Sequence, residues 1–106
     1  MPKYLQQFSY TAEGLKGLLK DSGSKRRAAI AETVKSAGGK LETLYFAFGE
    51  FDAYAIIEAP DNSSAAAVAL AANAGGAVRL KTTVLLTPEE VDQATKKSVS
   101  YRPPGG

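Results

Sequence analysis

The chain has 106 residues and a formal net charge of +2; 44% of the residues are hydrophobic, 23% are charged, and neither Cys nor His occurs. This length predicts one domain with a single core, and no apolar run is long enough for a membrane helix. Without Cys there is no disulfide or thiolate nucleophile, and without His the chain lacks the commonest general base and transition-metal ligand. We therefore expect no cofactor and no tightly bound transition metal.

The charge pattern also limits the partners. The net charge is small, and the one dense basic cluster, Lys25-Arg26-Arg27, is more typical of a solvated helix start than of a phosphate-binding patch. We expect no nucleic-acid partner and no membrane association. The first residues show no charged segment followed by an apolar one, so no signal peptide is predicted and a cytoplasmic location is expected.

Alternation and β-prone runs predict four strands, over residues 3–10, 41–48, 53–59 and 77–86. The first strand carries Gln6 and Gln7 on opposite faces, which a central strand tolerates if one face looks into a polar cavity. The second and third strands are joined by Gly49-Glu50-Phe51-Asp52 and are predicted to form a hairpin. The rest of the chain is arranged around this turn.

Helical patterns occur at four places: a short leucine stripe at residues 15–19, a main helix over 24–37, an Ala-rich helix over 65–74, and a short C-terminal helix after 87–90. The predicted N-caps are Thr11 for the leucine stripe, Asp61 for the Ala-rich helix and Thr87 for the C-terminal helix. Each of the two larger helices ends in a glycine pair, and the pairs stand 37 residues apart (75 minus 38). The two halves of the chain therefore echo one another.

Two β-α-β halves in tandem predict the α+β class, as a ferredoxin-like plait. Its sheet would have four antiparallel strands in the order 4-1-3-2, with two main helices on one face and the short C-terminal helix outside. Residues 1–97 would form the domain, and residues 98–106 a flexible tail.

This plait leaves one face of the sheet uncovered. The side chains predicted there are Glu42, Leu44, Phe46 and Phe48 from the second strand and Asp52, Tyr54, Ile56 and Glu58 from the third. So many aromatic and aliphatic groups would make an exposed apolar patch. We therefore expect a second copy of the chain to bury it, giving a two-fold homodimer or a higher oligomer of such dimers.

The turn Gly49-Glu50-Phe51-Asp52 resembles the Gly–aromatic–Asp turn that gives the GYD-domain family its name. Further family-like residues follow in the right order: Tyr4, Tyr10-Thr11, Gly14, Gly39, Tyr45, Ala59-Pro60-Asp61, Gly76, Val78-Arg79 and Thr82. The resemblance covers about residues 4–97. Phe51 departs from the family name, which implies Tyr, so a phenol hydroxyl is not essential at this position.

The resemblance implies a place in the dimeric α+β-barrel superfamily, in agreement with the plait and the dimer expected from the residues. Members of the GYD-domain family are mostly without an assigned reaction. The wider superfamily includes cofactor-free oxygenases, lactone isomerases, haem-degrading enzymes and ligand-sensing domains. Many of those enzymes use His, which this chain lacks.

Candidate site residues lie at the turn and on the predicted uncovered face. Asp52 would be either a catalytic base beside aromatic side chains or a turn former, and the sequence leaves both roles open. Tyr54 is the second candidate catalytic residue. The candidate ligand contacts are Tyr45, Phe48, Glu58 and Arg79. Tyrosines here also suit core or dimer contacts, and Arg79 suits either an anionic ligand or a salt bridge across the dimer.

Two functions remain open. The first is a small-molecule-binding protein, whose enzymatic form would be a cofactor-free oxygenase or isomerase acting on a small aromatic or acidic metabolite. The second is a non-catalytic structural or interaction protein whose sheet face serves only for dimerisation. A cavity on which Asp52, Tyr54 and Arg79 converge would favour the first function, and a dry, filled interface would favour the second.

Overall fold

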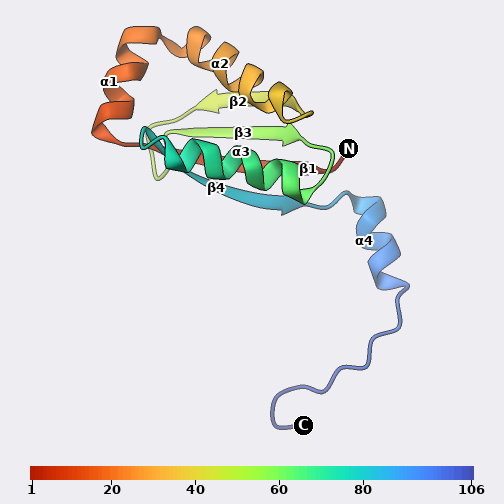
Figure 1. Ribbon diagram of the computed structural model, residues 1–106. Helices are drawn as coiled ribbons and strands as arrows, with labels where there is room; N and C mark the ends of the chain where they lie inside the picture. The colour runs from red at the N-terminus through yellow and green to blue at the C-terminus, as the bar shows by residue number, and fades with distance from the viewer.

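The computed structural model describes residues 1–106. The elements, in chain order, are β1 (Lys3–Tyr10), α1 (Ala12–Asp21), α2 (Gly23–Ser36), β2 (Lys40–Phe46), β3 (Ala53–Glu58), α3 (Asn62–Ala74), β4 (Val78–Leu85) and α4 (Pro88–Thr95). The strands form one antiparallel sheet in the order β2-β3-β1-β4, and α2 and α3 cover one of its faces (Figure 1). The predicted ferredoxin-like plait is confirmed.

The core lies between this face and the two helices. Every second residue of β1 and β3 points into it, and these side chains are at most 5% exposed: Tyr4, Gln6, Phe8, Ala53, Ala55 and Ile57. Ile30 and Val34 of α2 complete the core from the helix side. The alanines of β3 leave room for close helix packing, because their side chains end at Cβ.

The helix starts agree with the sequence. The N-cap side chains of Thr11 and Asp61 accept hydrogen bonds from the backbone N–H groups three residues ahead, at 3.1 and 2.8 Å, and Thr87 and Glu90 form the predicted capping box. Gly38 and Gly76 take the left-handed conformation after the two larger helices, with φ of 84° and 79°. The first glycine of one pair and the second of the other do this, so the two junctions differ in detail.

The register of β2 corrects the predicted uncovered face. Opposite β3, the register shifts between Leu41 and Thr43, which is a β-bulge with one extra residue. A shift of one residue moves every later side chain to the other face. Leu44 and Phe46 therefore lie opposite buried alanines of β3 on the helix-covered side, and Thr43 and Tyr45 take the open face. The expectation that Leu44 and Phe46 lie on the open face is wrong.

Two parts of the chain lie outside the core. The leucine stripe forms a separate helix, α1, whose Leu15 and Leu19 are 43% and 86% exposed, so the stripe is not a core face. Helix α4 has no buried residue, and it extends away from the body together with residues 96–106 (Figure 1). None of the helices has the length and apolar character needed to cross a membrane.

Candidate functional site

Asp52 holds the hairpin turn to the end of β1. Its carboxylate oxygen Oδ2 accepts a hydrogen bond from the backbone N–H of Tyr10 at 2.8 Å. Its own N–H donates to the carbonyl of Phe8, and its carbonyl accepts from the N–H of Ala47, both at 2.8 Å. The partner of the carboxylate is a backbone group 42 residues away, so the side chain fastens the turn to β1 and does not form an Asx turn within its own loop. Of the two roles open to Asp52, a structural role at the turn is the one for which the structure supplies partners.

Phe51, in the same turn, organises the open face of the sheet next to it. Tyr45, Tyr54, Gln7 and Lys81 form a row of successive cross-strand neighbours on this face. The ring of Phe51 meets the ring of Tyr54 edge-on, with centroids 5.9 Å apart, and Lys81 Nζ lies 5.7 Å from the Phe51 centroid. Both geometries are attractive, so Phe51 positions Tyr54 and Lys81.

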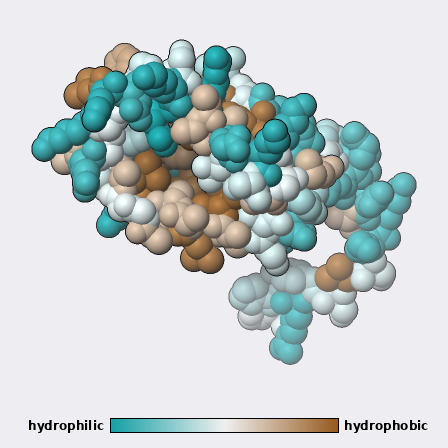
Figure 2. All heavy atoms as spheres, turned by 45° about the horizontal axis from the view of Figure 1, so that its top comes forward, coloured by the Kyte–Doolittle hydropathy of each residue, from teal (hydrophilic) through white to brown (hydrophobic).

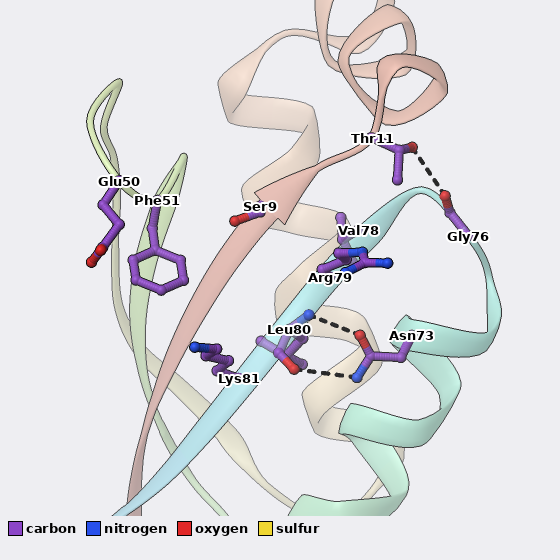
Figure 3. Close-up of a pocket in the computed structure, with 10 residues that line it drawn as sticks. All are labelled: Ser9, Thr11, Glu50, Phe51, Asn73, Gly76, Val78, Arg79, Leu80 and Lys81. Atoms are coloured by element: carbon purple, nitrogen blue, oxygen red, sulfur yellow. Dashed lines mark hydrogen bonds between the residues drawn. The ribbon is translucent and has the colours of Figure 1, made fainter.

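A groove of about 780 Å³ opens beside this row at the edge of the sheet (Figure 3). Ser9, Phe51, Asn73, Arg79 and Lys81 are among its lining residues. Neither basic side chain forms an ion pair, because the single salt bridge of the protein joins Lys3 and Glu42. Glu50 also lines the groove, so two basic side chains stand against one acidic one, and this excess of positive charge suits an anionic partner.

The residues predicted for the site do not converge on one cavity. Arg79 lines the groove, but Asp52 is turned to the Tyr10 N–H and Tyr54 to Phe51. Glu58 lies opposite Lys3, and Arg79 lies opposite Ser9. These places are six residues apart along β1, or about 20 Å. Among the other predicted contacts, Tyr45 is 72% exposed, and Phe48 lies beyond the end of β2 and is fully exposed.

A second cavity, of about 290 Å³, lies on the other side of the sheet, between α2 and α3. Its walls are mainly apolar, with Phe8, Ile30, Val68 and Leu80 among them, and Arg26 and Thr33 supply polar groups from α2. Figure 2 shows apolar residues gathered around a hollow on the helix-covered side, between rims of polar side chains. This composition is typical of a small-molecule site.

Gln6 brings the one buried polar side chain of the core into this cavity. The residue is 1% exposed and lines the cavity floor, and its amide nitrogen Nε2 has no hydrogen-bond partner. The hydroxyl of Tyr10 is also buried and unpaired; it belongs to a neighbouring cavity of about 280 Å³ that shares Arg26 with the first. Arg26 is therefore common to both cavities. The other walls of the neighbouring cavity come mainly from α1 and include the acidic side chains of Glu13 and Asp21.

Shifted ionisation occurs elsewhere in the molecule. The hydrogen bond to Glu42, at 2.6 Å, raises the pKa of Lys3 above its ordinary value. The backbone N–H of Ser64 lowers the pKa of Asp61. Both groups are exposed caps or rim charges, and neither lines the cavity of Gln6. No three His, Cys, Asp or Glu side chains lie close enough together to hold a metal ion.

The cavity residues Gln6 and Arg26 are absent from the set of site residues predicted from the sequence. A signal for Gln6 was present, because paired glutamines on opposite faces of a central strand indicate a polar cavity on one side. The cavity lies on the helix-covered face, where Gln6 points, and Gln7 faces the open side. Arg26 gave no such signal, since a run of basic residues is usually a solvated helix face.

Comparison with known proteins gives one match. The family model of the GYD domain matches residues 4–95, and a search among curated proteins finds no match. The α+β fold described above is consistent with the dimeric α+β-barrel superfamily. Because the matched segment spans most of the 106 residues, the protein belongs to the GYD-domain family.

Proposed function

We propose that the protein binds a small molecule with an apolar body and a carboxylate or carbonyl group in the cavity between α2 and α3. The observation that carries this proposal is the amide of Gln6, buried in an otherwise apolar core with its Nε2 unpaired. A buried donor without an acceptor costs about 1 to 3 kcal/mol of folding free energy. A ligand oxygen would remove that cost once the Gln6 amide turns its Nε2 toward the cavity, because this atom is buried in the present conformation.

The dimensions and charge of the cavity set the ligand class. A cavity of about 150 Å³ accommodates benzene, so about 290 Å³ suits a substituted single ring or a short acyl chain. Arg26 lines the wall shared with the neighbouring cavity and forms no ion pair. A carboxylate would gain a charge-assisted hydrogen bond from its guanidinium group, which favours small aromatic or aliphatic acids.

Binding is better supported than a reaction. The residues that line the cavity include no Asp, Glu or Tyr; Tyr10, Glu13 and Asp21 line the neighbouring cavity. Asp52 lies on the turn with its carboxylate bound to the Tyr10 N–H. An oxygenase or isomerase would need a group at the ligand to accept a proton. The proposed function is therefore that of a binding module, not of a cofactor-free enzyme.

The test uses benzoate and phenylacetate as acidic probes, and benzamide as the neutral counterpart of benzoate. We expect the acids to raise the melting temperature, and the Arg26→Gln variant to bind benzoate about tenfold more weakly in calorimetry, because it loses one charge-assisted hydrogen bond. Arg27→Gln is the matched control, since Arg27 follows Arg26 on α2 but lines a different surface pocket. The proposal is wrong if no probe stabilises the protein, or if both variants lose the same affinity.

We also infer a homodimer formed through the open face of the sheet. The centre of that face still carries Leu5, Tyr54 and Ile56, each partly exposed, although Leu44 and Phe46 do not contribute. This inference also serves the second candidate function, an interaction protein whose sheet face only dimerises. Light scattering at micromolar concentration should give twice the chain mass, and a monomer would contradict the inference.

A further inference from the structure

The outer edge of β4 is the least protected backbone of the sheet. β4 is an edge strand of eight residues, and its residues 81–84 are exposed. The edge of a strand presents unpaired N–H and C=O groups that can pair with another chain. In this sheet the β2 edge and the β4 edge differ in how far they are covered.

The β2 edge is protected in three ways that proteins commonly use. Helix α2 packs along β2, and the bulge between Leu41 and Thr43 interrupts its regular ladder. Bulges and charged side chains at an edge discourage further strand pairing. Lys40 and Glu42 add such charges at the start of β2.

The β4 edge is covered only in its first half. The side-chain amide of Asn73 accepts from the N–H of Leu80 at 2.8 Å and donates to its carbonyl at 3.2 Å (Figure 3). Alternate residues of an antiparallel strand turn both backbone groups to the same side. Because those of Leu80 point outward, those of Thr82 and Val84 do so too. No bulge or proline interrupts β4. The outward backbone groups of residues 82–84 can therefore form hydrogen bonds with another strand.

The charged residues before and after the unpaired segment 82–84 of β4 indicate which kind of chain pairs with it. Arg79 and Lys81 stand on the first half of β4, without ion pairs. Helix α4, which follows β4, carries Glu89 and Glu90 in its first turn and contacts little of its own domain (Figure 1). If a second copy paired its β4 antiparallel to this one, its acidic α4 would lie beside Arg79 and Lys81. The charges would then match on both sides of a two-fold axis.

We propose that the free half of β4 pairs antiparallel with β4 of a second copy, joining two sheets edge to edge, and that α4 of each copy docks beside Arg79 and Lys81 of the other. If Leu80 keeps its two hydrogen bonds to Asn73, the register between the two β4 strands places Thr82 opposite Val84 of the second copy. Thr83 then faces Thr83 of the second copy at the axis. This contact goes beyond small-molecule binding and uses a different surface from the open-face dimer.

Engineered cysteines test this register directly, because the chain has no Cys of its own. Cα atoms of a non-hydrogen-bonded antiparallel pair lie about 4.5 Å apart, within the range that a disulfide bridges. We expect Thr83→Cys to form a disulfide-linked dimer under mild oxidation. Thr43→Cys is the matched control, since Thr43 stands in the same cross-strand row at the opposite edge of the sheet.

The result expected on a non-reducing gel is a dimer for Thr83→Cys and a monomer for Thr43→Cys, with both variants folded by circular dichroism. Absence of the Thr83 crosslink, or equal crosslinking of both variants, overturns the proposal.

A charge exchange tests the docking of α4. Arg79→Glu should raise the dissociation constant of the edge contact about two- to fivefold, as expected for an exposed ion pair. Adding Glu89→Lys to the same chain should restore the original value, because the pair is re-formed with reversed charges. If the double variant associates more weakly than the single one, α4 does not dock at Arg79.

Discussion

The two faces of the sheet differ in what their alternating residues do. On the helix-covered face, neighbouring residues of β1 and β3 such as Tyr4 and Ile57 are at most 1% exposed. On the open face, the row that runs from Tyr45 to Lys81 carries exposed ends and a charge over an aromatic ring. The closed face holds the unmatched amide of Gln6, whereas the polar side chains of the open face are partly or fully exposed. This difference is the basis for our proposals of ligand binding at the closed face and of assembly through the open face and its edge.

The largest expected effect concerns Gly14, in the first turn of α1. A Cβ at Gly14 would overlap the carbonyl of Ala77, which already accepts a hydrogen bond from the N–H of Thr11 at 3.0 Å. We expect Gly14→Ala to lower the free energy of unfolding by about 3 kcal/mol, because backbone must move. Gly17 of the same helix has open space around it, so Gly17→Ala should raise stability by up to about 1 kcal/mol. Urea unfolding measures both, and equal effects would contradict this packing.

Two adjacent isoleucines compare the faces directly. Ile57 is fully buried beneath the helices, and Ile56 lies on the open face. Ile57→Ala should destabilise the fold by about 2 to 5 kcal/mol. Ile56→Ala should have less effect on unfolding of the monomer and should weaken the homodimer, as measured by light scattering across a dilution series. If Ile56→Ala leaves the dimer intact, the open face is not the interface.

Substitutions of Asp52 distinguish a turn-forming role from a role as a base. Asp52→Ala removes the acceptor of the Tyr10 N–H, and we expect a loss of about 1.5 kcal/mol in chemical unfolding. Asp52→Asn keeps an acceptor oxygen in the same place and should lose clearly less. If Asp52→Asn were as unstable as Asp52→Ala, the charge and not the turn geometry would be what the structure requires.

The smallest expected effects are changes of stability with pH, and they come from two exposed ionisable groups, Lys3 and Asp61. The pKa of Lys3 is raised above 10.5 by Glu42, so its contribution to stability is complete below pH 10.5 and is lost as the pH rises through the raised value. The pKa of Asp61 is lowered below 3.8, so its contribution is complete above pH 3.8 and is lost as the pH falls through the lowered value. Melting curves recorded against pH test both. Lys3→Met should remove the part of the alkaline loss that comes from Lys3, and Asp61→Asn the part of the acidic loss that comes from Asp61.

The sequence predicts the fold well because local signals decide it. The caps at Thr11, Asp61 and Thr87 and the glycine pairs mark the helix ends, and the structure uses each of them. Many family-like residues turn out to have such structural roles, as Gly14 and Asp52 show. These two residues serve the fold, and they say little about a ligand.

The candidate site was harder to predict, because two of its determinants are not local. A bulge in β2 arises from pairing with β3 and has no marker in the segment Leu41–Thr43, so strict alternation put Leu44 and Phe46 on the wrong face. The cavity of Gln6 depends on how far α2 and α3 stand apart above the sheet, which the pattern of either helix does not contain. Only the paired glutamines of β1 pointed to it.

The most direct test of the ligand cavity compares those two glutamines. Gln6→Met removes the unmatched buried amide, and Gln7→Met changes the same residue type on the open face. We predict that Gln6→Met raises the free energy of unfolding by about 1 to 2 kcal/mol and abolishes stabilisation by benzoate, which at 100 times its dissociation constant would be about 2.7 kcal/mol in the unchanged protein. Gln7→Met should keep the benzoate effect in full. A Gln6→Met variant that is no more stable and still gains the full benzoate stabilisation would contradict the account.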